Sequence, residues 1–566
     1  MEEHKSRWYG GCAPGSRPVA IPVGAQVLWR EPALWVCGGW DPAHVRTMEL
    51  GDARIAVLGP CSASERDLAR ALSVPELATV ARSWAGAHTV VRAGARGGAV
   101  EVLADAAESS PLYMVNAPGG LVWGSSALAL SSLADGGADL EWLATYLRDK
   151  YAPARDRSAW SGVKPVPAGY MLMLGAGGTG LSPWWRPLRR TPEDASAALR
   201  HALSEGVRVR VEGVPVSADL AGMDSSTVTL LAAQYGPVTG VTVHPEGVTT
   251  GGDMEYARAL NVPGLSRVYF PLGARHLPFS EAEAELPATD EPAPSAPVWA
   301  MLSDQLGAMA AAGSAAHLTG DGGDNLFLSA PTHLAGLARR GHWVRMYRDA
   351  MEWARLRRQS PLPLIAAAVR GDAAYAGRAA FPRPPWLAAE VPEPNTGSPD
   401  ADTAFVASVR SVARSVRSEL QLADSLGVAL HNPYFDGAVL DAVVSAPIEQ
   451  RYSARRYKPM LADTFADLLP DAHRKRAAKG LFVGDFHHGL LVNRHRWLTL
   501  SDGRLASLGL IDPAPLRAAL HSASLGVESV WPPLLAAVSA ETWLEAVERT
   551  PGTKWTNTAP APADAR

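Results

Sequence analysis

The chain has 566 residues, of which 47% are hydrophobic and 19% charged, with a formal net charge of −4. A single core rarely grows beyond about 250–300 residues, so this length predicts more than one domain. The near-balanced charge gives no electrostatic case for nucleic acid as a partner. No segment reaches the ~20 uncharged apolar residues of a membrane span.

Two further features indicate a cytoplasmic location. Cys12, Cys37 and Cys61 lie near the N-terminus without metal-ligand spacing, and so few cysteines suit a reducing compartment. The N-terminal stretch "MEEHKSRW" is charged and lacks the apolar core of a signal peptide. We therefore expect a cytoplasmic protein with no membrane span.

The first part of the chain predicts a β-rich domain. "TVVRAGARGGAVEVLAD" and "PLYMVNAPGGLVWGSS" each contain two short apolar runs joined by a glycine-containing turn. "ADLEWLATYLRD" then predicts a helix. "RTPEDASAALRHALSEGV" predicts another, with Thr191 as N-cap and Pro192 at the first helical position.

From Val214 the chain alternates short apolar runs with helical ones, which indicates a parallel sheet covered by helices. The runs are "VPVSADL", "STVTLLAAQY", "VTGVTV", "DMEYARAL" and "SRVYF". Two proline-rich stretches, "PATDEPAPSAP" and Phe381 to Pro399, predict exposed loops. We expect an α/β protein with domains at 1–185 and 186–550 and a disordered tail at 551–566.

The stretch "LAGMDSS" follows an apolar run and opens a helix. In an open parallel sheet, ligands bind beyond the carboxyl ends of strands, where a helix N-terminus attracts anions. Gly222 permits close approach of a phosphate, and Ser225 and Ser226 add hydroxyl donors. Asp224 has the wrong sign for a phosphate unless Mg²⁺ lies between them. A capped strand-turn-helix corner explains the same residues, so this loop alone does not distinguish a phosphate site from an ordinary helix start.

A second acidic, glycine-rich corner occurs in "AAHLTGDGGDNLF", which contains Asp321 and Asp324. It too can be a capped helix start. Two such loops after two strands of one sheet favour a shared ligand, however. Asp224 and Asp324 are then expected to converge on one cation that bridges triphosphate oxygens.

Several segments, in order, resemble the asparagine synthetase-like superfamily. "LAGMDSS" resembles its pyrophosphate-binding loop, and "TGDGGDNLF" resembles its second acidic loop. "NPYFDGAVLDAVVSAP" and "RYKPMLADTFADLLPDAHRKRAAKGLF" are similar to its C-terminal segments, and "DAAESSPLYMVNAPGGLVWGSSALAL" to its glutaminase-like region. The resemblance implies an N-terminal glutaminase-like (Ntn-type) sandwich and a C-terminal PP-loop synthetase domain, of the adenine-nucleotide α-hydrolase type.

The resemblance also implies a set of site residues. ATP and pyrophosphate are assigned to Leu220, Ala221, Gly222, Asp224, Ser225, Ser226, Gly320, Gly322, Gly323 and Lys458. Mg²⁺ is assigned to Asp224 and Asp324, catalysis to Lys479 and Asp321, and peptide binding to His431. Solvated helix charge is nevertheless the favoured interpretation for Lys458, Lys475 and Arg476. A buried structural histidine explains His431 equally well.

The chain departs from the family pattern at three places. Glu2 stands where asparagine-forming members carry the cysteine of their glutaminase, so we expect a supporting N-terminal domain without that nucleophile. Leu220 and Ala221 replace a serine and a glycine of the phosphate loop. Asp321 and Ala429 replace a Tyr-Glu pair that assists amine deprotonation in β-lactam synthetase.

These departures are similar to those of the lasso peptide cyclases, which the chain also resembles in "SADL" and in Lys479-Gly480. The resemblance implies ATP- and Mg²⁺-dependent adenylation of an Asp or Glu side chain in a leader-free precursor peptide, followed by attack of its N-terminal amine. A leader peptidase and a leader-binding protein are the expected partners. A β-lactam or asparagine synthetase relative, and a non-catalytic peptide-binding paralogue, remain alternatives.

Overall fold

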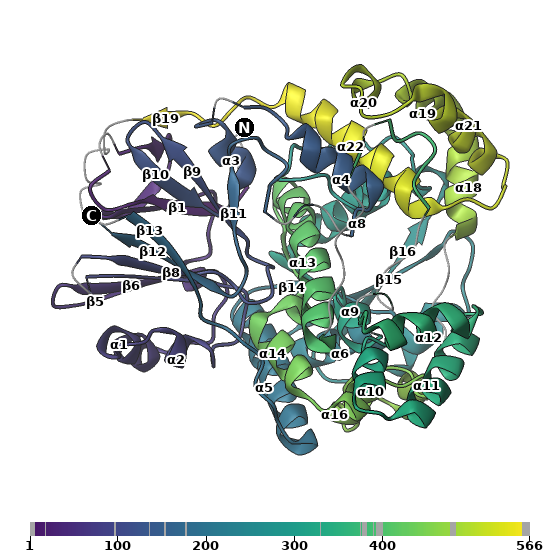
Figure 1. Cartoon of the computed structure of the whole chain (residues 1–566), viewed down its shortest axis with the longest axis horizontal. Coiled ribbons are helices and arrows are strands. Elements are labelled where there is room, and N and C mark those ends of the chain that lie inside the picture. Colours follow the sequence, from purple (N-terminus) through teal and green to yellow (C-terminus); the bar gives the residue numbers. More distant parts are fainter. Residues whose placement is uncertain are drawn as a thin grey trace.

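The computed structural model describes residues 6–556, apart from 17–18, 95–97, 135, 152–153, 155, 176–177, 329, 374, 376–381, 389, 392–399 and 476–482. Figure 1 shows two antiparallel sheets at the left, formed by the N-terminal part of the chain, and a helix-rich C-terminal part at the right. The long green helix α13 (Ala401–Ser425) runs between them.

The N-terminal domain contains two six-stranded sheets in which every pairing is antiparallel. The first has the order β11 (Lys164–Val166), β9 (Leu112–Ala117), β10 (Gly120–Gly124), β1 (Trp8–Cys12), β4 (Ala33–Cys37), β3 (Gln26–Arg30). The second has the order β13 (Gly178–Pro183), β12 (Tyr170–Gly175), β8 (Val100–Leu103), β7 (Thr89–Ala93), β6 (Ala53–Leu58), β5 (Val45–Leu50). The predicted hairpins are therefore confirmed as β7–β8 and β9–β10.

The two sheets form the middle layers of a four-layer arrangement. Their facing sides share one core, to which Leu34 and Val36 contribute from the first sheet and Val91 and Val102 from the second. Helices α1 (Glu65–Ser73) and α2 (Ala78–Ala81) cover the outer face of the second sheet. Helices α3 (Ala127–Ser131), α4 (Leu140–Arg148) and α22 (Trp531–Arg549) cover the first.

The C-terminal domain is built on a parallel five-stranded sheet. Its order is β16 (Leu265–Leu272), β15 (Val238–Pro245), β14 (Val216–Asp219), β17 (Ala316–Leu318), β18 (Ala429–His431). The chain builds outward from β14 to β16 and then returns to the other side for β17 and β18. The strand order therefore reverses between β14 and β17, which makes the crevice beyond their carboxyl ends the expected ligand site. The predicted fold class, with an antiparallel β-rich domain followed by a parallel-sheet domain, is confirmed.

Helices surround this sheet and extend beyond it. Those near the sheet are α5 (Pro192–Val211), α6 (Met223–Ala232), α7 (Gly252–Ala259), α8 (Trp299–Ala311), α9 (Gly323–Phe327), α13, α14 (Gly437–Ser445), α15 (Ile448–Arg451), α16 (Pro459–Thr464) and α17 (Asp471–Lys475). The outlying ones are α10 (His333–Arg339), α11 (Trp343–Leu356), α12 (Pro361–Arg370), α18 (Val483–Val492), α19 (Arg494–Leu500), α20 (Arg504–Ser507) and α21 (Pro513–Ser524). Thr191 caps α5 as predicted, because its side chain accepts a hydrogen bond from Asp194 N at 3.1 Å.

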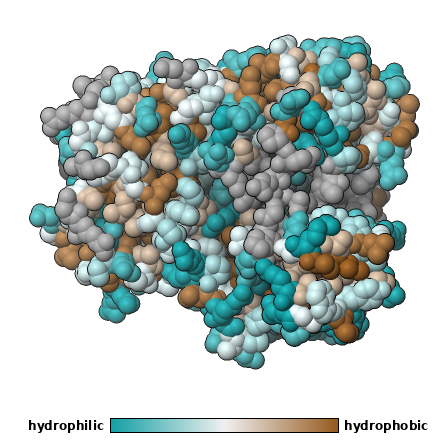
Figure 2. Space-filling view, in the orientation of Figure 1, coloured by the Kyte–Doolittle hydropathy of each residue, from teal (hydrophilic) through white to brown (hydrophobic). Residues whose placement is uncertain are grey.

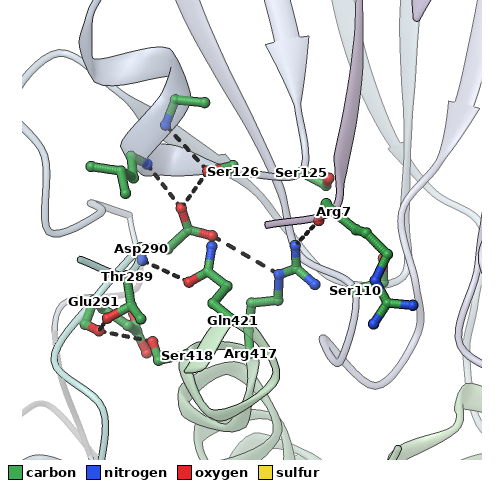
Figure 3. A network of polar contacts seen from close by, with 12 residues as sticks. Arg7, Ser110, Ser125, Ser126, Thr289, Asp290, Glu291, Arg417, Ser418 and Gln421 are labelled. Carbon is green, nitrogen blue, oxygen red and sulfur yellow. Dashed lines mark hydrogen bonds and ion pairs between the residues drawn. The ribbon is translucent and has the colours of Figure 1, made fainter. Parts of the chain in front are cut away.

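The stretch "PATDEPAPSAP" is not the exposed loop that its prolines and acids predict. Asp290 is 2% exposed, and its carboxylate accepts hydrogen bonds from Ser126 Oγ at 2.7 Å and Leu128 N at 2.9 Å. Its backbone N–H donates to Gln421 of α13 (Figure 3). The neighbouring Glu291 pairs with a buried Arg414. Partners that lie far away in sequence thus allow this polar segment to join the two domains from inside.

The end of the chain returns to the N-terminal domain. Helix α22, yellow in Figure 1, crosses the molecule and leads to β19 (Trp555–Thr556), which pairs with β2 (Ile21–Pro22). The rings of Trp8 and Trp35 pack against Trp555. At these two residues the structure differs from the predicted disordered tail, because Trp555 has aromatic neighbours that composition alone does not reveal.

On the face shown in Figure 2, no large hydrophobic or hydrophilic patch stands apart. Figure 2 shows hydrophilic and hydrophobic residues intermixed over the viewed face. Within the described ranges, no helix combines the length and apolar character needed to cross a bilayer.

Candidate active site

The first predicted loop lies at the switch point of the parallel sheet. Helix α6 begins at Met223, so Asp224 and Ser225 belong to its first turn rather than to a loop before it. Gly222 is the N-cap residue, and no described side chain caps this helix end. A Cβ built on Gly222 meets no described atom within 4 Å, so there is open space beside the helix N-terminus. The first-turn N–H groups and the helix dipole therefore favour an anion here.

The second loop is pressed against the first, and its glycines make this contact possible. A Cβ on Gly320 would lie 2.6 Å from Ser225 N, and a Cβ on Gly323 would collide with the Asp224 side chain. Gly322 has a φ of +94°, in the left-handed region that favours glycine. The run of glycines therefore brings Asp324, at the start of α9, toward Asp224.

Lys458 pairs with both acids. The prediction that Lys458 is a solvated charge on a helix surface is therefore wrong. Its side chain is 0% exposed and forms ion pairs with Asp224 and, at 2.6 Å, with Asp324. Burial alone lowers the pKa of Lys458, but the two carboxylates outweigh burial and raise that pKa above its usual value. By contrast, the Lys475 side chain is 79% exposed, in agreement with the expectation for it.

The backbone at Lys458 supports a special role. Its φ of 43° and ψ of 57° are left-handed values, which cost a side-chain-bearing residue about 1–3 kcal/mol. Proline follows at position 459 and starts α16. The surrounding structure thus holds the ammonium in place against a local preference, as functional sites commonly do.

The two carboxylates fit a magnesium ion held together with nucleotide phosphates. Both reach one ammonium group, so they face a common point. Among the residues that the structure describes, no group of three or more His, Cys, Asp or Glu side chains is arranged to hold a metal. Mg²⁺ typically takes one or two protein carboxylates and completes its octahedron with phosphate oxygens and water. Asp224 and Asp324 match that pattern.

Two of the residues assigned to phosphate do not face the ligand side. Leu220 is 0% exposed, and its backbone is engaged, since its N–H donates to Val241 O and its carbonyl accepts from Thr242 Oγ1. The Ser226 side chain is also fully buried. Ser225 instead holds the loop itself, because its Oγ accepts a hydrogen bond from Ala221 N at 3.1 Å. An anion at this turn would therefore meet backbone N–H groups rather than side-chain hydroxyl groups.

Asp321 is exposed at the start of the second loop, where its N–H donates to Thr319 Oγ1 at 3.1 Å. Its charge acts on Glu419 of α13. The pKa of Glu419 is raised to about 7, first by burial and also by the Asp321 charge, although hydrogen bonds from Ser295 oppose the rise. Glu419 stands in mid-helix without a motif, so no sequence signal marked it.

Other predicted or overlooked residues are placed as follows. His431 is 8% exposed, lies 6.0 Å from the His44 ring in an edge-on contact, and has a pKa well below its usual value because of burial. Asp219, at the end of β14, contacts His317 and Gln305, each at 3.2 Å; it belongs to the "SADL" stretch, but no role is predicted for it from the sequence. Lys479, the assigned catalytic lysine, and Arg476 lie outside the described residues.

The three cysteines are free and buried. Burial raises the pKa of the Cys12 thiol to about 11 and that of Cys61 to about 12. Since the thiolate is the nucleophile, neither thiol is suited to nucleophilic catalysis near neutral pH.

The asparagine synthase family profile matches residues 198–545, and no curated protein matches the chain. Among solved structures, glutamine phosphoribosylpyrophosphate amidotransferase from B. subtilis, complexed with ADP and GMP, is 8% identical. The match covers 56% of this chain and 76% of that chain, with a TM-score of 0.21. A structure of the allosteric regulatory enzyme of purine biosynthesis is 9% identical, with 56% and 75% covered and a TM-score of 0.22.

The family match spans both acidic loops, the β17–β18 region and Lys458, and so includes every residue of the cluster at the switch point. The chain therefore belongs to the asparagine synthase family of ATP-dependent, amide-forming ligases.

Proposed function

We propose that this ligase closes a macrolactam ring in a peptide. An Asp or Glu side chain of a leader-free precursor attacks the α-phosphorus of ATP, and pyrophosphate leaves. The peptide's own N-terminal amine then attacks the acyl carbon, loses a proton, and displaces AMP. The product is an isopeptide-closed ring of the lasso peptide type.

The activation step is supported by the cluster of Asp224, Asp324 and Lys458. The N–H groups at the start of α6 and the Lys458 ammonium supply positive charge where pyrophosphate is released. Asp224 and Asp324 would hold Mg²⁺, which would supply further neutralisation of charge on the leaving group. Lys479, in the family's late basic segment, is proposed to act at the same stage.

One observation supports a peptide amine as the nucleophile, rather than ammonia or the amine of a β-lactam precursor. The positions that resemble the Tyr-Glu pair hold an exposed Asp321 and Ala429, neither of which reproduces that pair. An N-terminal α-amine has an ordinary pKa of about 7.7–8.0, so it needs little help to lose its proton. Burial of the Cys12 and Cys61 thiols likewise disfavours ammonia release from glutamine.

The proposed partners follow from this substrate. The precursor core peptide must be freed from its leader before its N-terminal amine can react. We therefore propose that a leader peptidase and a leader-binding protein of the same pathway act before this enzyme.

The experiment is to incubate the purified protein with ATP, Mg²⁺ and a leader-free core peptide from its own gene neighbourhood. We expect AMP and pyrophosphate, and a peptide that has lost one water and resists aminopeptidases. A dehydrated product whose N-terminal amine still reacts with labelling reagents would contradict ring closure. Incorporation of ammonia into the peptide would instead indicate amidation.

A non-catalytic peptide-binding role is the second candidate, and the buried Leu220 favours it, because that residue replaces a hydroxyl of the phosphate loop. Exchange of labelled pyrophosphate into ATP separates the two candidates. Exchange that depends on the peptide supports the ligase, whereas silence with every carboxylate supports the binding role.

A further inference from the structure

A cavity lies between the two domains, beside the edge strand β18. It has two compartments, of about 280 Å³ and about 80 Å³. Both are lined by Arg7, His44, Arg210, Asp424 and His431. Exposed Gly39 and Gly427 line the larger compartment, so this end opens to solvent. The smaller compartment extends inward to Tyr9, Ser110 and Arg417.

Strand β18 is the edge strand of the parallel sheet, and Ala429, Leu430 and His431 line the cavity. Ala429 N donates to Ala315 O and His431 O accepts from Thr319 N, both at 3.0 Å, so these two residues pair with the β17 side. Leu430 lies between them, and its backbone groups therefore point the other way. Within the described part of the chain, its N–H and C=O have no hydrogen-bond partner. Leu430 is nevertheless 4% exposed and lines the cavity.

Buried N–H and C=O groups are almost always paired with protein or water, so a ligand that displaces water here must offer both an acceptor and a donor. One residue of another extended chain offers a C=O and an N–H with the same spacing. It can therefore pair with both backbone groups of Leu430. A simple carboxylate could satisfy the N–H group but would leave the C=O unpaired.

Two side chains extend the same pattern inward. Asn432 is 7% exposed; its Oδ1 accepts from Thr319 Oγ1 at 2.7 Å, while its Nδ2 has no partner among the described residues. Arg417 directs its guanidinium toward Arg7, whose backbone oxygen accepts a hydrogen bond at 2.7 Å (Figure 3). The inner compartment therefore presents donors suited to further carbonyl or carboxylate oxygens.

We propose that this cavity binds an extended segment of the peptide substrate, with one residue pairing to Leu430 and a neighbouring carbonyl accepting from Asn432 Nδ2. The inference rests on the proposed function, since it requires a peptide substrate. Asn432 contacts Thr319, which directly precedes Gly320 of the second acidic loop. The segment would thus be held next to the loop where the carboxylate is activated.

The first test is a scan of single N-methyl groups along the leader-free core peptide, measured by peptide-dependent pyrophosphate exchange. N-methylation removes one donor and leaves the buried Leu430 carbonyl unpaired. We expect the KM for peptide to rise about tenfold at one position of the segment and little at its two neighbours. Equal effects at all positions, or none, would overturn the proposal.

The second test narrows the mouth of the cavity. A Cβ on Gly39 meets no described atom within 4 Å, and the same is true of the exposed Gly137, which does not line the cavity. Gly39→Trp should raise the KM for peptide about tenfold while the KM for ATP stays unchanged. The matched variant Gly137→Trp should change neither value.

A third readout does not require turnover. Addition of core peptide without ATP should slow hydrogen exchange of the backbone segment that contains Leu430. Wild-type protein that shows exchange of pyrophosphate, but neither protection of this segment nor sensitivity to Gly39→Trp, would overturn only this inference. Wild-type protein that shows no pyrophosphate exchange with any peptide would overturn the proposed function as well.

Discussion

Two clusters of acids in this chain look alike in composition but differ in their surroundings. At the domain junction, Asp290 and Glu291 receive hydrogen bonds or ion pairs from α3 and α13. At the switch point, Asp224 and Asp324 both pair with Lys458 beside an open helix N-terminus. A carboxylate enclosed by protein donors stabilises the fold, whereas carboxylates that converge beside open space are available to a ligand.

The largest effect that follows from this contrast is a loss of activity at the switch point. Asp224→Asn or Asp324→Asn should reduce ATP turnover by at least about 10²–10³-fold, because each removes an anionic ligand from the proposed Mg²⁺ site. Ser225→Ala should do less, since its hydroxyl holds the loop rather than the ligand. Turnover is measured as AMP formation across a Mg²⁺ titration. Near-normal turnover of both Asp variants at limiting Mg²⁺ would contradict the assignment.

Lys479 provides the next test. Lys479→Ala should lower the rate by about 10²–10³-fold with little change in ATP affinity, because its charge is proposed to act where negative charge develops. Lys479→Arg should recover little activity, since a planar fork differs from a compact ammonium. Comparing ATP binding with single-turnover rates separates these effects. Loss of ATP binding in the alanine variant would make Lys479 a ground-state contact instead.

At the domain junction, substitutions should lower stability rather than ATP affinity. Arg414→Met leaves the buried Glu291 without its cation and should lower the free energy of unfolding by about 3–5 kcal/mol. ATP affinity of the remaining folded protein should be unchanged. Arg456→Met, which breaks an exposed pair with Asp463, is the matched control and should cost at most about 1 kcal/mol. Equal losses of stability in both variants would show that the buried Arg414–Glu291 pair does not stabilise the domain junction.

Lys458 sharpens the comparison further. Lys458→Met leaves two converging carboxylates without their shared cation, so it should destabilise the protein in metal-free buffer by roughly 1–3 kcal/mol, given that Asp324 is 42% exposed. Added Mg²⁺ should restore part of that loss by taking the place of the ammonium, and thermal melts with and without Mg²⁺ measure it. Identical Mg²⁺ responses in the variant and the wild type would contradict a cation site between the acids.

A further effect concerns the pH dependence of stability. The pKa of Glu419 is raised from 4.5 to about 7, so the folded state favours its protonated form. The stability from this group is fully present below pH 4.5 and is lost as the pH rises through about 7. Glu419→Gln should flatten the dependence of unfolding free energy on pH across this window. An unchanged slope would show that the carboxyl titrates elsewhere.

Local signals predicted much of this architecture. Thr191 before Pro192 marked the start of a helix, the alternation after Val214 indicated the parallel sheet, and the glycines around Asp321 indicated a tight acidic turn. Each of these features depends on neighbours within a few residues.

The features that escaped prediction depend on distant partners. Lys458 meets an acid 234 residues away, and Asp290 a helix start 164 residues away. A buried lysine and a solvated one look the same in the local sequence. The same is true of a buried and an exposed segment rich in proline and acids. Only the assembled fold shows which charges are enclosed.

The most direct test measures ATP affinity and unfolding together for Asp324→Asn and Asp290→Asn. The account predicts that Asp324→Asn loses Mg²⁺-dependent ATP binding while its melting temperature is kept. It predicts that Asp290→Asn binds ATP normally when folded but melts several degrees lower, since its carboxylate joins α3 to the junction. The reverse pattern, with ATP binding lost at Asp290 and stability lost at Asp324, would contradict it.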